Sequence, residues 1–365
     1  MAVLYISYDG AAEALGQSQV VAYLEHLARE REITLVSFEK PGADREAMAR
    51  RLAAAGIRWR PLSYHRRPPV LSTAWDVLAG ARAVRSEPTP QLIHARSDVP
   101  ALIALAAGRP GKLLFDTRGF WADERVDLGI FRRSGLLYRL ARRWERRFYS
   151  EADAVVVLTE AAVPQVRRWL GGRDVPVEVI PTCTDVERFA GSTPRPEGPH
   201  AVWCGSVARY RLDLGVRLAA VLELPLTVLT GEVERARAGA PAADVREVAP
   251  ERMPEELHEG DIGLCLASPS FARTATSPTR VAEYLAAGMP VAVTPGLGDL
   301  EALVEDEMVG AVVREENGAA VARAAAELRE LAADPGARDR CRAVARERFD
   351  LSPGVAAYAA LYRSL

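Results

Sequence analysis

Several features that mark other protein classes are scarce in this chain of 365 residues. Lys40 and Lys112 are its only lysines, so nearly all of its positive charge is arginine, and its formal net charge is -2. Such a balance does not commit the chain to nucleic acid, and we expect no nucleic-acid partner. No apolar run approaches the roughly 18 residues that span a bilayer, and the first residues, MAVLYISYDG, contain no basic leader. We therefore expect a cytoplasmic protein.

Metal-binding patterns are also missing. The four cysteines, Cys183, Cys204, Cys265 and Cys341, have no metal-ligand spacing, and three of them lie in apolar, strand-like contexts. This favours buried free thiols. The sequence contains no Asp-x-Asp motif to hold a metal–diphosphate complex and no Cys/His cluster for zinc. We expect neither a metal nor a cofactor.

Short apolar runs alternate with longer amphipathic segments along the whole chain. Runs of four to six apolar residues bounded by Gly, Pro or Asp are typical of strands buried on both faces. Strand–helix alternation predicts parallel sheets in doubly wound, Rossmann-like α/β domains. The expected strands are Val3–Ser7, Ile33–Phe38, Leu92–Ala95, Leu113–Thr117, Ala154–Thr159 and Val177–Pro181, then His200–Gly205, Leu226–Gly231, Val245–Val248, Ile262–Ala267, Pro290–Thr294 and Gly310–Val313.

A segment rich in Pro, Gly and Ser, AGSTPRPEGPH (Ala190–His200), is predicted to be a linker. It divides the chain into a domain of residues 1–190 and a domain of residues 191–351, which we expect to face each other across a cleft. A helix is expected over about 318–349. After a break, a last helix over 352–365, with Ser352 as N-cap and Pro353 in its first turn, is expected to return to the first domain.

The strongest functional signal is the segment SPTRVAEYLAAGMPVAVTPGLGDLEALV, which begins at Ser277. Ser277 is expected to cap a helix whose first residue is Pro278, leaving the amides around Thr279 and Arg280 open to a diphosphate. Arg280 adds a full positive charge there. Glu283 lies one turn further on the same face, where a carboxylate accepts hydrogen bonds from a ribose diol. The competing interpretation is a surface helix with an ordinary cap and a solvated Glu283.

This segment resembles the C-terminal signature of the family-4 retaining glycosyltransferases, which have the GT-B fold. AAGMPV, ending at Val291, matches the middle of that signature, and GLGDLE, ending at Glu301, resembles its last part. HARSDVPALIALA, FDTRGFWADERVD, ADAVVVLTEAA and VIPTCTDVERF resemble a bacterial branch of the family. The resemblance implies transfer of a sugar, with retention at the anomeric carbon, from a UDP- or GDP-sugar to a saccharide, lipid-linked or small-molecule acceptor.

One position departs from the family pattern. The family has two glutamates with seven residues between them, the second corresponding to Glu283, whereas the first position holds Ala275. In the family the earlier carboxylate contacts the donor sugar. Two alternatives therefore stay open: a nucleotide-sugar epimerase, which shares the architecture, and a catalytically impaired nucleotide-sugar-binding protein.

The resemblance also implies site residues at other strand ends. In the second domain, Gly205 and Ser206 end the first strand and Arg209 is expected to hold the diphosphate, while Arg211 is expected to be solvated. In the first domain the donor-facing loop is expected at Gly16 and Gln17. Catalytic roles are expected for Arg96, Arg118 and Glu124. Arg96 takes the place at which the family often presents a histidine to the donor sugar, which leaves a simply buried His94 as the alternative to a sugar-facing one. Glu124 lies with Phe120, Trp121 and Asp123 in a loop that is expected to face a saccharide.

The segment Arg132–Tyr149 contains seven arginines and one glutamate. Its apolar residues form one helical stripe: Leu137, Leu140, Ala141, Trp144 and Phe148. A basic amphipathic helix lies readily on anionic lipid, which would suit a lipid-linked acceptor and a peripheral location at the membrane. The competing interpretation is a core helix with a solvated basic face.

Overall fold

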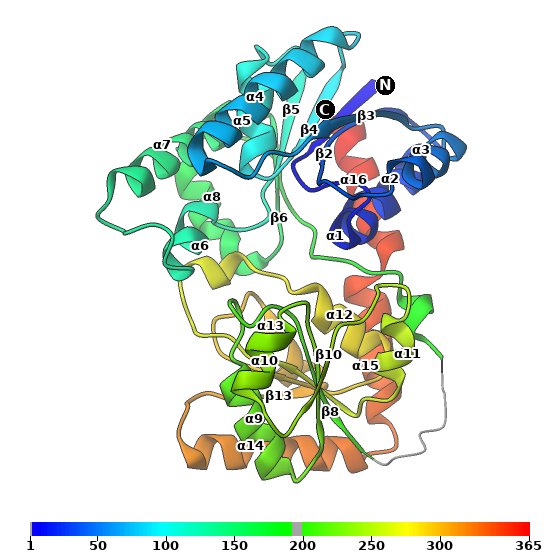
Figure 1. The fold of residues 1–365 in the computed structure, drawn as a ribbon, viewed down its shortest axis with the longest axis vertical. Coiled ribbons are helices and arrows are strands. Elements are labelled where there is room, and N and C mark those ends of the chain that lie inside the picture. Colours follow the sequence, from blue (N-terminus) through cyan, green and yellow to red (C-terminus); the bar gives the residue numbers. More distant parts are fainter. Residues whose placement is uncertain (1, 192–198) are drawn as a thin grey trace. The chain divides into compact units, whose positions relative to one another are not determined.

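The computed structural model describes residues 2–191 and 199–365, and the chain forms two compact units (Figure 1). The first unit contains Met1–Ile180 and Gly354–Leu365, and the second contains Pro181–Pro353. Each unit has one parallel sheet with helices on its faces, so the two doubly wound domains expected from the sequence are confirmed.

The sheet of the first unit has the strand order β3-β2-β1-β4-β5-β6-β7, so the winding direction reverses between β1 and β4. Its strands are β1 (Ala2–Ser7), β2 (Glu32–Glu39), β3 (Arg58–Ser63), β4 (Leu92–Arg96), β5 (Lys112–Asp116), β6 (Ala154–Val157) and β7 (Val177–Val179). Its helices are α1 (Ala14–Gly16), α2 (Ala22–Leu27), α3 (Arg45–Ala54), α4 (Pro69–Ser86), α5 (Asp98–Ala106), α6 (Trp121–Asp127), α7 (Leu136–Glu151), α8 (Val163–Leu170) and most of α16 (Leu351–Ser364).

Strand β3 is missing from the sequence-based prediction. It is the edge strand next to β2, and its residues RWRPLS are partly exposed rather than buried on both faces. An edge strand needs no continuous apolar run, and it tolerates a proline such as Pro61. Apolar runs identify β1, β2, β4, β5 and β6 because those strands are deeply buried. They also identify β7, the partly exposed strand at the other edge, because two of its three residues are valines.

The sheet of the second unit has the order β10-β9-β8-β11-β12-β13, with the reversal between β8 and β11. Its strands are β8 (Ala201–Cys204), β9 (Leu226–Leu229), β10 (Asp244–Arg246), β11 (Ile262–Cys265), β12 (Val291–Val293) and β13 (Gly310–Val312). Its helices are α9 (Leu212–Leu222), α10 (Val233–Gly239), α11 (Met253–His258), α12 (Thr279–Ala286), α13 (Leu300–Asp306), α14 (Gly318–Ala333) and α15 (Ala337–Phe349).

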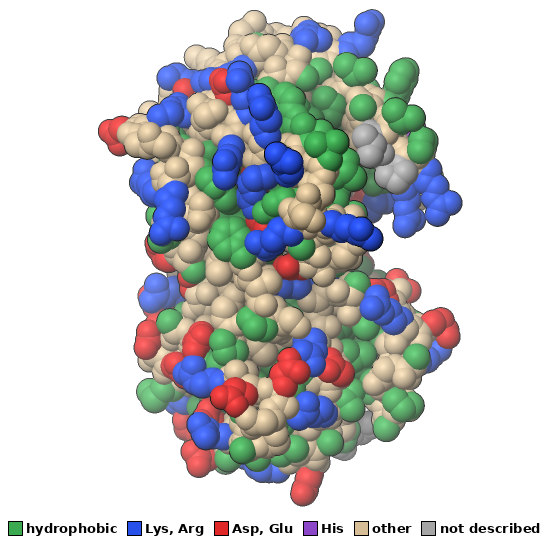
Figure 2. All heavy atoms as spheres, turned by 90° about the vertical axis from the view of Figure 1, so that its left-hand side faces the viewer, with side chains coloured by type: hydrophobic (Ala, Val, Ile, Leu, Met, Phe, Trp, Pro, Cys, Tyr) green, Lys and Arg blue, Asp and Glu red, His purple; other side chains and the backbone are tan. Residues whose placement is uncertain are grey.

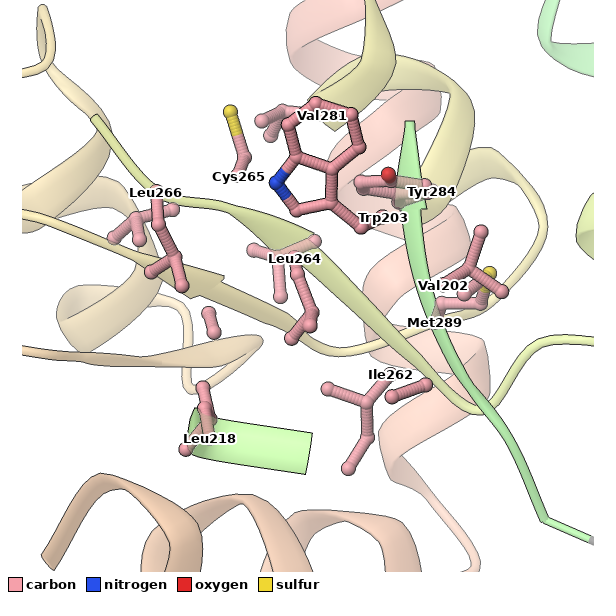
Figure 3. Close-up of a cluster of buried hydrophobic side chains, with 14 of the residues drawn as sticks. Val202, Trp203, Leu218, Ile262, Leu264, Cys265, Leu266, Val281, Tyr284 and Met289 are labelled. Carbon is pink, nitrogen blue, oxygen red and sulfur yellow. The ribbon is translucent and has the colours of Figure 1, made fainter. Parts of the chain in front are cut away.

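The core of the second unit fixes α12 against the sheet (Figure 3). Trp203 of β8 and Tyr284 of α12 are fully buried among aliphatic side chains. Gly263 of β11 lets the Tyr284 ring lie directly on the strand, because a Cβ at that position would overlap the ring. The start of α12 is thereby positioned by packing as well as by its own sequence.

The division between the units lies ten residues before the expected one. Residues 192–198 of the predicted linker lie outside the described residues. The segment before them packs in the second unit, where Val186 and Phe189 join the core and Thr184 pairs with Asp350. The chain therefore passes from the first unit to the second at Ile180.

The C-terminal helices differ in detail from the prediction. The helix expected over about 318–349 is broken into α14 and α15 at residues 334–336. Helix α16 begins at Leu351, and the amide of Ser352 donates to Asp350 Oδ2 at 3.2 Å, so Ser352 is not its N-cap. From Gly354 onward α16 belongs to the first unit, which confirms the predicted return. Within the described residues, no helix has the length and apolar character needed to cross a bilayer.

Candidate functional site

The second unit reverses its winding between β8 and β11. In open α/β sheets ligands bind at the carboxyl ends of the strands beside such a reversal. Residues 205–211 follow β8, and residues 266–278 follow β11 and lead into α12. The expected donor-binding residues of this unit, including Gly205, Ser206, Arg209 and Arg280, come from these segments and from the start of α12.

The Arg280 guanidinium group lies across the end of β8. Its Nη1 donates to the Cys204 carbonyl, and its Cζ lies 4.2 Å from the centroid of the Tyr210 ring. Gly205 has φ of +142° and passes so close to the guanidinium that a Cβ there would overlap it. Arg280 Nε is buried, and within the described chain it has no hydrogen-bond partner.

Two further arginines lie beside the same tyrosine. Arg273 donates to the Arg209 carbonyl, and its Cζ lies 5.2 Å from the Tyr210 centroid. Burial raises the pKa of Tyr210, while Arg280, Arg273 and Arg209 all act to lower it. Three guanidinium groups thus gather at the reversal point. Sequence reasoning missed Arg273, although its position in the loop after β11 was a usable signal.

The start of α12 presents open backbone donors. The helix begins at Thr279, with Pro278 as N-cap, and the first backbone bond is from the Val281 amide to the Pro278 carbonyl. Across residues 2–191 and 199–365, no group accepts from the amides of Thr279 and Arg280. The predicted cap is wrong, because Ser277 Oγ instead accepts from the Thr182 amide at 3.2 Å. The open donors and the helix dipole still favour an anion here.

The turn after β8 is held by Ser206. Its Oγ donates to Glu232 Oε1 at 2.6 Å, and its carbonyl accepts from the amides of Arg209 and Tyr210. Arg211, expected to be solvated, forms ion pairs with Asp213, at 2.6 Å, and with Glu316. These bonds fix the loop and leave Arg209 as its exposed arginine.

Glu283 is partly buried, one turn after Thr279. Burial raises the pKa of Glu283, while Arg280 and Arg188 act in the opposite direction. The carboxylate makes no hydrogen bond or ion pair with any residue that the structure describes. It is therefore not the fully solvated side chain of the competing interpretation.

Ala275 ends a 3₁₀ turn, Ala272–Ala275, and is buried with 4% of its surface exposed. The position that carries a glutamate in the resembled family is thus occupied here by a packed methyl group. The neighbouring carboxylates do not form a metal site in place of the missing glutamate. Within the described residues, no three His, Cys, Asp or Glu side chains are placed to hold a metal ion.

Arg96 and Arg118 of the first unit lie at the carboxyl ends of β4 and β5. Arg96 is buried and pairs with Asp9, which follows β1 on the other side of the reversal point. Arg118 Nη1 lies 3.4 Å from Asp116 Oδ1. Burial would raise the pKa of Asp116, but Arg118 and the hydrogen bond from His94 outweigh it and lower the pKa to about 2. Asp116 joins the two arginines into one charged group.

His94 is fully buried, which is one of the two interpretations that the sequence left open. Its Nδ1 lies 2.6 Å from the Tyr362 hydroxyl, its Nε2 lies 3.2 Å from Asp116 Oδ2, and burial lowers the pKa of His94. A cavity of about 10 Å³ beside His94 and Arg118 has room for about one water molecule. The histidine is thus a structural link to α16 rather than a group facing a ligand.

Glu124 belongs to a different group of charges. Burial and the charge of Glu124 raise the pKa of Asp98 to about 7. Burial and the charge of Asp98 raise the pKa of Glu145 to about 8, and Glu124 acts in the same direction. Arg142 Nη1 lies 2.5 Å from Glu145 Oε2, and the same guanidinium contacts Asp123. The expected saccharide-facing loop is largely interior, because Asp123 and Phe120 are buried.

The expected loop at Gly16 and Gln17 is wrong, because both residues are helical. Gly16 ends α1, and Gln17 starts a π-helical turn, Gln17–Val21, that continues into α2. A Cβ at Gly16 would overlap the Gly10 carbonyl, so the glycine serves close packing. The Gln17 side chain donates to the Ala12 carbonyl and accepts from Arg51, both at 3.2 Å.

Comparison with known proteins found a family model in each half of the chain. The model Glycosyltransferase Family 4 matches residues 16–188, and the model Glycosyl transferase-like matches residues 218–358. Curated protein sequences gave no match.

Solved structures are similar to the whole chain at low sequence identity. Sucrose-phosphate synthase from Thermosynechococcus elongatus has a TM-score of 0.73 at 15% identity, covering 100% of this chain and 98% of that one. WaaG, a glycosyltransferase involved in lipopolysaccharide biosynthesis, gives 0.69 at 13%, covering 98% and 99%. HepE of Anabaena, in complex with UDP and glucose, gives 0.66 at 15%, covering 100% and 99%. With a glycosyltransferase model in each half and this fold over the whole chain, the protein is a glycosyltransferase with the GT-B fold.

Proposed function

We propose that this protein binds a nucleotide-diphosphate sugar at the reversal point of its second unit and transfers the sugar to a saccharide, lipid-linked or small-molecule acceptor. The observation that carries the proposal is the convergence of Arg209, Arg273 and Arg280 with the open amides of α12 and the unpartnered carboxylate of Glu283. Cations and open amides match a diphosphate, and a carboxylate one turn away matches a ribose diol.

Each residue of the second unit has a proposed role. Arg280 and Arg209 grip the diphosphate, and Arg273 adds charge beside them. Gly205, Ser206, Ser277 and Thr279 shape the two segments that supply backbone donors. The Anabaena protein HepE was solved in complex with UDP and with UDP-glucose, so we propose a uridine nucleotide as the first donor to test.

We further propose transfer with retention and without a metal. The bond between the anomeric carbon and the phosphate oxygen breaks as the acceptor oxygen bonds to that carbon, and the departing phosphate takes the acceptor's proton. Negative charge grows on the diphosphate during this step, and guanidinium groups held in advance stabilise it. In the first unit, Arg96 and Arg118 are proposed to bind polar groups of the substrates. Glu124 has no proposed catalytic role, because it lies with buried carboxyls.

A lipid-linked acceptor requires a protein that reaches a membrane surface. Helix α7 supports a peripheral contact, because Leu137, Leu140 and Trp144 are exposed together with arginines of the same helix. The core-helix interpretation does not account for these exposed side chains. We propose that this helix contacts anionic lipid.

The donor site is tested with UDP and the variant Glu283→Ala. We expect calorimetry to show UDP affinity about tenfold to a hundredfold weaker, since a hydrogen bond to a charged group contributes about 1.5–3 kcal/mol. Glu327→Gln, an exposed glutamate on α14, is the control and should bind UDP as the wild type does.

Two outcomes would contradict the proposal. Equal UDP affinity of Glu283→Ala and wild type would remove Glu283 from the donor site. A UDP-sugar that is converted to another UDP-sugar in the absence of any acceptor would show an epimerase instead.

Transfer that persists in excess chelator is the expected result for a metal-free mechanism. Loss of transfer in chelator that magnesium or manganese restores would refute that mechanism.

A further inference from the structure

Helix α4 carries a second exposed apolar stripe that the proposed function does not use. Leu71, Trp75 and Leu78 are 69%, 63% and 65% exposed. Their spacing places them on one side of the helix, and Arg82 and Arg85 continue the same side over the next two turns. Single exposed apolar residues are common, but three large ones in a row mark an interaction surface.

Helix α7 carries a matching stripe. Leu136, Leu137, Leu140 and Trp144 are all exposed, Leu136 by 78%. Arg142 of the same helix lies over the Trp169 ring of α8, at 4.7 Å from its centroid. Arg142 therefore marks the side of α7 that faces α8. Because successive residues of a helix are rotated by 100°, Leu137 and Trp144 lie on the opposite side of α7.

Both stripes belong to the same face of the first unit. Helix α5 packs against α4 on one side and α7 on the other, so the three helices cover one side of the sheet (Figure 1). Figure 2 shows this face, where hydrophobic side chains and Lys or Arg side chains gather and acidic side chains are sparse. We call the surface formed by Leu71, Trp75, Leu78, Leu137, Leu140 and Trp144 the α4–α7 face.

The charges around the α4–α7 face are mostly positive, and the one partly exposed carboxylate of α7, Glu151, is already paired with Arg147 and Arg109. Arg82, Arg139 and Arg143 are exposed, and none pairs with a carboxylate in the part of the chain that the structure describes. The acidic residues nearest in sequence, Asp76 of α4 and Glu145 of α7, are buried and point inward. Elsewhere many exposed arginines are paired, for example Arg252 with Glu255. The face therefore lacks its own counter-ions.

We propose that the α4–α7 face docks on an anionic lipid bilayer through both helices, with Trp75 and Trp144 inserted at the level of the headgroups. Apolar side chains bordered by arginines are the composition of surfaces that lie in the interfacial layer, and tryptophan favours that layer. Contacts through two helices fix the orientation of the first unit on the membrane, whereas a single helix would let the unit rotate about its axis. This inference rests on the proposed lipid-linked acceptor and extends the contact from α7 to α4.

Vesicle binding tests the α4 contribution directly. Co-sedimentation of the full chain with vesicles of phosphatidylcholine and phosphatidylserine should exceed that with phosphatidylcholine alone. The double variant Leu71→Ser/Trp75→Ser should reduce the partition coefficient at least tenfold, because it removes two large apolar groups. Arg143→Gln should reduce it about fivefold, the effect of one cation near an anionic surface.

Matched controls lie away from the face. Leu15→Ser in α1 and Arg323→Gln in α14 remove an exposed apolar group and an exposed arginine elsewhere, and both should bind vesicles like the wild type. The chain has six tryptophans, so three variants are compared: brominated lipid should quench part of the fluorescence in Trp144→Phe and in Trp75→Phe, and less in Trp75→Phe/Trp144→Phe.

The possible failures are distinguishable. Wild-type vesicle binding by Leu71→Ser/Trp75→Ser, with no quenching of Trp75, would refute the α4 contact and leave α7 alone. Equal binding to neutral and anionic vesicles, or a stable dimer that the α4 variant disrupts, would refute the anionic-lipid assignment. UDP binding by calorimetry, measured on the same variants without vesicles, reports separately on the donor site.

Discussion

At the scale of single residues, the close approach of Gly205 to Arg280 is the most exacting feature of the donor site. Gly205→Ala adds a Cβ where the guanidinium lies, at a φ of +142° that side chains disfavour. We expect this variant to displace Arg280 and to lower the free energy of unfolding by roughly 1–3 kcal/mol. Calorimetry should show UDP affinity reduced at least tenfold.

Gly231, which follows β9, is the matched control. A Cβ there would meet only Glu247 Oε1 at 3.6 Å, an ordinary contact. Gly231→Ala should leave stability and UDP affinity near the wild-type values. If Gly205→Ala bound UDP as tightly as Gly231→Ala, the position of Arg280 over β8 would not matter for binding.

Residue-level prediction from sequence succeeded where the signal is local. The positions of Arg280 and Glu283 on one helix follow from their spacing. The cap assigned to Ser277 failed because its partner is the Thr182 amide, 95 residues away in sequence. The contact of Arg273 with Arg209 and Tyr210 likewise depends on two loops meeting, which no local pattern reveals.

At the scale of elements, the buried carboxyls between α5 and α7 make stability depend on pH. In the unfolded chain Asp and Glu lose their protons near pH 4, whereas Asp98 and Glu145 in the folded protein hold theirs to about pH 7 and 8. Between these values the native state binds more protons than the unfolded state. The contribution of these groups to the free energy of unfolding therefore falls as pH rises from about 4 to 8.

Glu145→Gln tests this linkage. The amide keeps a hydrogen bond to Arg142 but cannot ionise, so we expect the variant to gain stability relative to wild type as pH rises from 5 to 8. Melting temperatures at both pH values measure the difference, with Glu327→Gln as an exposed control. Parallel pH profiles for wild type and Glu145→Gln would show that Glu145 is ionised in the folded protein.

Element prediction failed where burial is incomplete or a turn is short. Apolar runs mark the buried strands, but β3, an edge strand with two arginines and a proline, carries no such run. The break between α14 and α15 covers only residues 334–336, and the amphipathic pattern continues on both sides of it.

At the scale of the whole molecule, the first unit is completed by residues from the end of the chain. Tyr358 and Tyr362 of α16 are buried against His94 and Asp116. Tyr362→Phe leaves His94 Nδ1 without this partner in an interior site, and we expect a loss of about 1–3 kcal/mol. Denaturant unfolding followed by a signal from the first unit measures it.

The second unit supplies the internal control for this experiment. UDP binding to Tyr362→Phe at low denaturant should equal that of the wild type, because the donor residues lie in the second unit. A variant that loses UDP binding together with first-unit structure would show that the two units unfold as one.

The alternating pattern was sufficient to predict two doubly wound domains, whereas the return of the last helix was expected by analogy with other two-domain enzymes. The predicted boundary is ten residues late because composition points to a segment typical of linkers, whereas packing decides which residues belong to each unit. Val186 and Phe189 precede that segment and still belong to the core of the second unit.

The return of α16 also sets an order of events during synthesis. Residues 354–365 leave the ribosome only after all of the second unit has been made, which at cellular rates of translation takes roughly ten to thirty seconds. Throughout that interval the nascent first unit lacks Tyr358 and Tyr362, and the pocket around His94 stays open to water. The domain that is translated first can therefore complete its fold only after the last residues of the chain have been made.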